Sequence, residues 1–218
     1  MKLEGKKINF LGDSITQGFG VEESCNFYVN RIAERYGAVC RNYGISGTRI
    51  ARQKTPSEDP SHDLYFGSRV DGMDPDADNI FVFGGTNDFG HGDAPLGTMD
   101  DRTLDTFYGG LHLLYQQLMT KYPGKVIVIA TPLHRTNEDN VRGDGNKAED
   151  VAPLKTYAEI IREVAEYYSL PVLDLFRVSG LQPKVQAHLE MFVPDGLHPN
   201  DAGHAILADR IGAFLENI

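Results

Sequence analysis

The sequence has little cysteine and no long apolar run. Its two cysteines, Cys25 and Cys40, are too few for a disulfide framework, and a chain of 218 residues can bury a core without one, so we expect reduced, structural thiols. The apolar run at residues 8–11 is too short for the core of a signal peptide, and no stretch approaches the roughly 18 apolar residues of a membrane-spanning helix. We therefore expect a cytoplasmic protein, unless a leader has been removed, with no membrane partner.

Positive charge is also in short supply. Acidic residues outnumber basic ones by 31 to 21, which gives a net charge of -10 at pH 7. A net negative charge of this size repels phosphate backbones and anionic lipid surfaces, so we expect neither nucleic acid nor a membrane as a partner. Neutral molecules such as sugar esters meet no such repulsion. Hydrophobic and charged contents of 41% and 24% are ordinary for a globular protein and argue against disorder.

The chain shows no internal repeat, no low-complexity segment and no linker between two cores, so we expect a single domain over residues 1–218. Short runs rich in β-branched and aromatic residues alternate with helical patterns. We predict strands at residues 8–11, 39–43, 80–83, 126–130 and 172–176. Most of these runs lack alternation of polar and apolar residues, which is typical of strands covered on both faces.

Apolar residues at three- and four-residue spacing mark four helices between and after these runs. The helical faces run from Val29 to Tyr36, from Leu104 to Tyr122, from Leu154 to Tyr168 and from Leu207 to Ile218, with Asn200 or Asp201 capping the last one. A further helix is expected near residues 181–191. The alternation predicts an α/β fold, a three-layer α/β/α sandwich around a five-stranded parallel sheet. Segments 52–78, 89–101 and 136–150 are predicted to be long polar loops, which are more often functional than idle.

Small and reactive residues follow each of the first four predicted strands. They occupy residues 12–16, 42–47, 84–88 and 131–134, and a further group at residues 195–199 precedes the last helix. In an open α/β sheet, ligands bind beyond the carboxyl ends of the strands. The recurrence of such residues after several strands predicts a functional site at that edge of the sheet.

The residue types in these groups suit acyl transfer. A serine hydroxyl needs a base to become a nucleophile, and a histidine needs an acidic partner to fix its tautomer, so we expect Ser14, His198 and Asp195 to act together. The oxyanion of a tetrahedral intermediate needs hydrogen-bond donors aimed at it. The backbone N–H groups of Ser14 and Gly47 and the Asn87 side-chain amide are the predicted donors. Glycine at position 47 permits the close approach that a side chain could block.

These groups resemble the sequence blocks of the SGNH hydrolase superfamily, the GDSL esterases and lipases. The matching segments are 12–14, 42–47, 84–88 and 195–198, in the family's order, and its four named residues fall on Ser14, Gly47, Asn87 and His198. The resemblance implies a flavodoxin-like sandwich and ester hydrolysis through an acyl-serine intermediate, with no metal and no cofactor. The Gly-x-Ser-x-Gly elbow of α/β-hydrolases is absent. Gly44 leaves open which glycine donates, although spacing favours Gly47.

Several other residues are weaker candidates for substrate binding. Arg49 follows Gly47, His91 lies just beyond Asn87, and His134 ends the fourth strand. Asp13 is expected to hold the loop around the serine more than to contact substrate. Of the remaining histidines, we expect solvated side chains at positions 62 and 188 and structural ones at 112 and 204. No histidine pair has the spacing of a metal site.

The polar loops favour a small polar ester over a long acyl chain. Lipases usually present an apolar acyl groove, whereas segments 53–63 and 91–93 contain no large apolar residue. We therefore expect a short-acyl esterase, with acetylated oligosaccharide or another small ester as substrate. Three alternatives stay open: a lipase or thioesterase for longer chains, a flavodoxin-like phosphate or flavin-binding protein, and a non-catalytic sugar-binding module. The sequence also leaves a homo-oligomer open.

Overall fold

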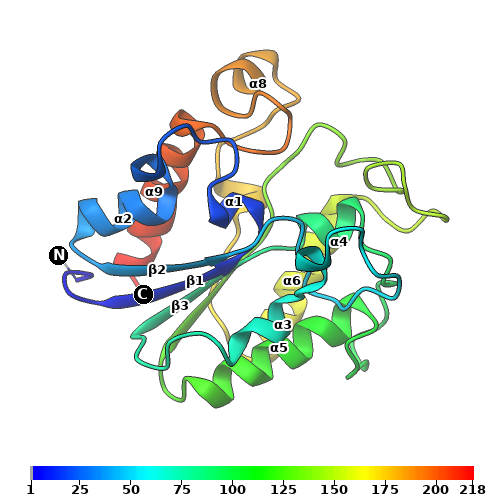
Figure 1. The fold of residues 1–218 in the computed structure, drawn as a ribbon, viewed down its shortest axis with the longest axis horizontal. Helices are drawn as coiled ribbons and strands as arrows, with labels where there is room; N and C mark the ends of the chain where they lie inside the picture. The colour runs from blue at the N-terminus through cyan, green and yellow to red at the C-terminus, as the bar shows by residue number, and fades with distance from the viewer. Residues whose placement is uncertain (1) are drawn as a thin grey trace.

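A single sheet of five parallel strands organises the chain, whose residues 2–218 are described by a computed structural model (Figure 1). The strands are β1 (Lys7–Gly12), β2 (Val39–Gly44), β3 (Asn79–Phe83), β4 (Val126–Ala130) and β5 (Val172–Leu173). Their order across the sheet is β2-β1-β3-β4-β5, and every neighbouring pair is parallel. The predicted α/β class and five-stranded parallel sheet are confirmed.

Helices cover both faces of this sheet, as Figure 1 shows for α2 and α9 on one side and α3 and α5 on the other. The helices are α1 (Ser14–Gln17), α2 (Tyr28–Tyr36), α3 (Phe66–Val70), α4 (Thr86–Gly90), α5 (Phe107–Lys121), α6 (Leu154–Tyr167), α7 (Leu175–Val178), α8 (Gln186–Phe192) and α9 (Asp201–Glu216), with 3-10 turns η1 (Ser24–Asn26) and η2 (Pro60–Asp63). Thr106 caps α5 by accepting a hydrogen bond from the Gly109 N–H, and Asn200 caps α9 in the same way.

Two hydrophobic cores lie on opposite faces of the sheet, because successive side chains of a strand point to opposite sides. In β3, Ile80 and Val82 pack with α5 and α6, whereas Phe81 and Phe83 pack with α2 and α9. Every residue of β3 is buried, which explains why its sequence lacks alternation.

The strand order reverses direction at β1, whose neighbours β2 and β3 continue on opposite sides of it. A crevice at such a switch point is the usual ligand site of an open α/β sheet. The short helices α1 and α4 directly follow β1 and β3, so both begin at this edge (Figure 1). The start of β1 and the C-terminal end of α9 lie at the opposite end of the sheet (Figure 1).

Several predicted boundaries were wrong. The strand predicted at 172–176 ends at Leu173, and Leu175–Val178 forms α7. β5 pairs only with β4, which ends at Ala130, so the ladder has no partner beyond Leu173. The Thr131 hydroxyl instead accepts the N–H of Phe176 at 2.9 Å.

Segment 52–78 was predicted to be a loop, but it contains η2 and α3. Phe66, Val70, Met73 and Ala77 are buried in the core beside α5, so this segment does contribute core residues. The helix α3 spans about a single turn, which is too short to show a helical period of apolar residues. In segment 89–101 the first two residues complete α4, whereas 136–150 is irregular as expected.

The long predicted helices are shorter at their ends. α5 begins at Phe107 rather than Leu104, because Thr106 caps it, and α9 ends at Glu216, which leaves Ile218 outside and 47% exposed. The helix expected near 181–191 is α8 (Gln186–Phe192). Cys25 and Cys40 are free thiols. Within residues 2–218, no helix is long and apolar enough to cross a membrane.

Candidate active site

Ser14 meets His198 at the carboxyl edge of the sheet. The Ser14 Oγ and His198 Nε2 atoms lie 3.0 Å apart, although 184 residues separate them in sequence. The other ring nitrogen, Nδ1, lies 2.6 Å from Asp195 Oδ2. A carboxylate only accepts hydrogen bonds, so Nδ1 carries the proton and Nε2 is free to accept from the serine hydroxyl. The three side chains form one continuous chain of hydrogen bonds.

The turn that carries Asp195 and His198 is held by the same carboxylate. Asp195 Oδ1 accepts the backbone N–H groups of Leu197 at 2.8 Å and of His198 at 2.6 Å. Partial burial would raise the pKa of Asp195, but these hydrogen bonds and the one from the His198 ring outweigh it and hold the pKa at about 2. Asp195 is therefore ionised at neutral pH. The ring of Phe19, which is 56% exposed, packs against the His198 ring at a centroid distance of 4.4 Å.

Ser14 is presented by a tight strand-to-helix turn. β1 ends at Gly12, Asp13 caps α1 by accepting the Ile15 N–H at 3.0 Å, and Ser14 is the first helical residue. Its backbone N–H therefore has no acceptor within the helix. Asp13 is only 2% exposed, and its burial raises the pKa to about 6. This burial and the cap hydrogen bond agree with a structural role for Asp13.

Gly47 occupies the tight turn that follows β2. Its φ of +73° is in the left-handed region that the third residue of a type II turn requires, and the Thr48 N–H closes the turn onto the Ile45 carbonyl at 3.4 Å. A side chain here would also meet the His62 ring, because a Cβ on Gly47 would lie 2.5 Å from it. The N–H of Gly44, in contrast, already donates to the Asn42 side chain. Gly47 is thus the glycine in the better position to donate.

Asn87 lies in the first turn of α4 and is 5% exposed. Its side-chain Nδ2 donates to the Thr48 carbonyl at 3.0 Å, which connects α4 with the Gly47 turn. The next residue, Asp88, strengthens this connection by accepting the N–H groups of Ile50 and Ala51, each at 2.9 Å. The two predicted oxyanion segments are therefore joined by hydrogen bonds that only the tertiary fold makes.

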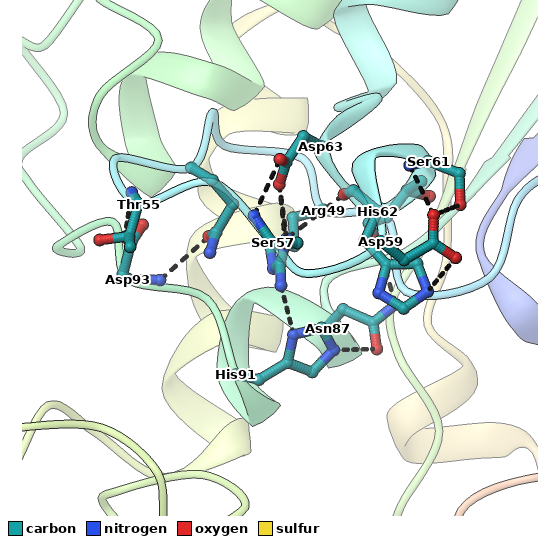
Figure 2. A network of polar contacts seen from close by, with 12 residues as sticks. Arg49, Thr55, Ser57, Asp59, Ser61, His62, Asp63, Asn87, His91 and Asp93 are labelled. Atoms are coloured by element: carbon teal, nitrogen blue, oxygen red, sulfur yellow. Dashed lines mark hydrogen bonds and ion pairs between the residues drawn. The ribbon is translucent and has the colours of Figure 1, made fainter.

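Arg49 is buried next to Asn87, whereas His91 is partly exposed. Figure 2 shows the contacts that connect Arg49 with His91 and His91 with the Asn87 side chain. Arg49 is 4% exposed, so its guanidinium is not free to reach a substrate in this structure, and burial lowers its pKa. Burial, followed by the nearby Arg49 charge, lowers the pKa of His91 to about 4.

Arg69 and His62 are two neighbours of the site that the sequence did not reveal. The Arg69 guanidinium donates to the carbonyls of Gly12 and Tyr43, at the ends of β1 and β2, and to the Thr48 hydroxyl. Burial lowers its pKa to about 10. The His62 side chain is 36% exposed, in agreement with the expected solvation, and its ring also lies against Gly47. Neither residue follows a strand or belongs to a recognisable pattern, so no signal in the sequence pointed to them.

His134 is not brought to the other candidate residues. Its Nδ1 lies 2.6 Å from Glu138 and its ring packs on Phe176 at a centroid distance of 4.0 Å. The neighbouring segment does reach the site turn, because the Thr136 N–H donates to the Gly196 carbonyl at 3.0 Å. His112 and His204 are buried, in agreement with structural roles. Among residues 2–218, no group of three or more His, Cys, Asp or Glu side chains could hold a metal ion.

A cleft of about 400 Å³ with a mixed lining adjoins His91. The three long segments 52–78, 89–101 and 136–150 meet there, since its walls include Lys54, His91, Asp93, Lys147 and Glu149. Charges of both signs line it. His91 connects this cleft with the site, because its ring contacts the Asn87 side chain.

Comparison with known proteins identifies the family of this chain. Residues 10–206 match the model of the GDSL-like Lipase/Acylhydrolase family, whereas no curated protein matches the chain. A solved protein from Lactobacillus plantarum is similar over 98% of both chains, with 29% identity and a TM-score of 0.83. A possible lipase from Chitinophaga pinensis is similar over 97% of this chain and 98% of its own, with 22% identity and a TM-score of 0.68.

A carbohydrate acetylesterase family member from Sinorhizobium meliloti shares the fold over 97% of this chain and 98% of its own, with 16% identity and a TM-score of 0.64. The family match spans the segments that carry Ser14, Gly47, Asn87 and His198. The chain belongs to the GDSL-like lipase/acylhydrolase family.

Proposed function

We propose that this protein is a serine esterase that hydrolyses short-chain carboxylic esters through an acyl-serine intermediate. The observation that carries the proposal is the continuous hydrogen-bond chain from Ser14 through His198 to Asp195, with distances of 3.0 and 2.6 Å. A serine within reach of a base, whose tautomer is set by a third group, is the arrangement that activates a hydroxyl for acyl transfer.

In the first half of the reaction, Ser14 Oγ attacks the ester carbonyl carbon and its proton passes to His198 Nε2. The carbonyl oxygen becomes an oxyanion, for which the N–H groups of Ser14 and Gly47 and the Asn87 amide are the donors. Collapse of this intermediate expels the alcohol, which takes the proton from His198. Water then attacks the acyl-serine, again with His198 as base, and releases the carboxylic acid and free Ser14.

Small polar esters, led by acetylated carbohydrate, are the substrate class that we favour. The cleft beside His91 carries charged side chains such as Lys54 and Lys147 among apolar ones such as Val151, so it offers polar partners to a substrate. The exposed Phe19 ring beside His198 offers one aromatic face, the kind of surface on which a sugar ring can stack. One structural neighbour is a carbohydrate acetylesterase family member, which supports the choice only through the shared fold.

The test is hydrolysis of p-nitrophenyl esters from acetate to decanoate, together with acetylated oligosaccharides, by wild type and Ser14→Ala. Loss of Ser14 should lower kcat by on the order of a thousandfold or more with an unchanged melting curve. Ser68→Ala, which removes an exposed hydroxyl on α3, is the matched control. Normal hydrolysis by Ser14→Ala would overturn the esterase proposal, and rates that rise with chain length would overturn the substrate class.

A further inference from the structure

A row of polar groups runs from the loop after β2 to the Asn87 side chain (Figure 2). The Asp63 carboxylate lies 3.8 Å from the Arg49 guanidinium, Arg49 Nη2 lies 2.5 Å from His91 Nδ1, and His91 Nε2 lies 3.2 Å from Asn87 Oδ1. Ser57 and the His62 carbonyl also contact Arg49. These contacts hold the Arg49 guanidinium in place beside His91.

The chemistry of the guanidinium determines the tautomer of His91. Arginine carries only donors, so Nδ1 of His91 must accept and cannot be protonated. A neutral imidazole then carries its proton on Nε2, which donates to Asn87 Oδ1. The low pKa of His91, about 4, agrees with a ring that stays neutral near pH 7.

This tautomer determines which way the Asn87 carboxamide faces. Its Oδ1 accepts from His91, and one hydrogen of its Nδ2 goes to the Thr48 carbonyl. A flipped amide would set a donor against the His91 N–H and an oxygen against the Thr48 oxygen. The second Nδ2 hydrogen remains for another acceptor.

We propose that His91 is a positioning residue for the reaction, which orients the Asn87 amide toward the oxyanion while Arg49 sets the His91 tautomer. This inference rests on the proposed function, because it assigns a purpose to the free Asn87 N–H. It also gives His91, which lines the cleft, a role that does not require contact with the substrate, and it replaces the expectation of direct contact for the buried Arg49. Each acts through the next residue of the row.

A double-mutant cycle tests the coupling between His91 and Asn87. His91→Ala should lower kcat about tenfold with little change in KM, because part of one oxyanion donor is lost. In an Asn87→Ala background the same change should cost less than about twofold, since nothing remains to be oriented. Equal losses in both backgrounds would overturn the proposal.

A matched pair of variants separates orientation from packing. His91→Gln places an amide N–H near the position of Nε2 and should stay within about threefold of wild-type kcat. His91→Asn is too short to reach Asn87 and should resemble His91→Ala. If Gln and Asn lose the same activity, the hydrogen bond to Asn87 is not what matters. Because both side chains are amides, the comparison holds even if His91→Ala fails to fold.

A readout independent of turnover is the ¹⁵N spectrum of histidine-labelled protein. His91 should show an unprotonated Nδ1 and a protonated Nε2 at neutral pH, and the opposite tautomer would overturn the assignment. Failure of the proposed function would instead appear as normal hydrolysis by Ser14→Ala, whatever the cycle gives. The two failures are therefore distinguishable.

Discussion

His198 and Asp195 are joined twice within one turn of the chain. One carboxylate oxygen of Asp195 accepts from the His198 ring at 2.6 Å, and the other accepts from the His198 backbone N–H, also at 2.6 Å. The same side chain thus positions the histidine and fixes its proton on Nδ1. Because the pKa of Asp195 is about 2, its carboxylate stays ionised, and remains an acceptor for the His198 ring, throughout the neutral range.

Asp195→Asn should lower kcat by on the order of a thousandfold or more, because an amide no longer holds the tautomer in which Nε2 accepts from Ser14. The measurement is steady-state hydrolysis of p-nitrophenyl acetate. Asp201→Asn, at the start of α9, is the control, since Asp201 contacts Asn26 and the Glu22 N–H rather than His198. Near-normal turnover by Asp195→Asn would remove Asp195 from the mechanism.

Gly47→Ala should lose activity through both its backbone and its new side chain. A positive φ costs an alanine roughly 1–2 kcal/mol, and the added Cβ would stand 2.5 Å from the His62 ring. We expect kcat to fall about a hundredfold as the Gly47 N–H moves away from the oxyanion.

Gly124→Ala is the matched control for this change. Gly124 has a φ of +72° but nothing within 4 Å of an added Cβ, so it carries the same backbone cost without a clash. It should lose stability, measured by urea unfolding, while it keeps wild-type kcat. If Gly47→Ala also kept wild-type kcat, Gly47 would not be an oxyanion donor.

Arg69→Met should destabilise the protein and lower its activity together. The substitution removes the guanidinium donor from the carbonyls of Gly12 and Tyr43, of which Gly12 keeps the Ile45 N–H, and we expect the free energy of unfolding to fall by about 1–3 kcal/mol. Arg102→Met is the comparison, because Arg102 also donates to two backbone carbonyls but is exposed. Equal stability of the two variants would show that the strand ends do not depend on Arg69.

His204 should make stability fall in acid. Its Nδ1 accepts the Tyr28 N–H at 3.1 Å, the residue is completely buried, and burial lowers its pKa from 6.5 to about 4. The unfolded chain therefore binds more protons in this window, so the contribution of His204 is complete above about pH 6.5 and is lost as the pH falls toward 4. The loss amounts to about 3 kcal/mol between pH 7 and pH 4.

His204→Asn retains an acceptor near the position of Nδ1 but cannot be protonated there. Urea unfolding of this variant should depend less on pH between about 6.5 and 4 than that of wild type. His91, whose pKa is also about 4, should account for part of the dependence that remains. An unchanged slope in His204→Asn would mean that His204 does not titrate on unfolding.

The sheet could be predicted because its strands are buried on both faces. Runs such as 80–83 and 126–130 are apolar at every position, and a segment covered by helices on both sides has no alternative to that composition. The order of segments along the chain then indicated the edge of the sheet after which Ser14, Gly47 and Asn87 follow their strands. Helices of about one turn, such as α3, were not predicted, because they have too few residues to show a period of apolar residues.

The hydrogen-bond partners of Arg49 and His91 could not be predicted from the sequence. Taken singly, each is a polar residue next to a reactive group, and such residues are expected to face the ligand. Only the fold shows that Arg49 is 4% exposed and that its partner His91 is 42 positions away in sequence. The sequence by itself determined which residue types gather at the carboxyl edge of the sheet, because the positions of strands and loops along the chain follow from the hydrophobic pattern. Tertiary structure decided which of them are exposed and which are buried and paired, because that depends on packing and on hydrogen bonds between segments that are far apart in the chain.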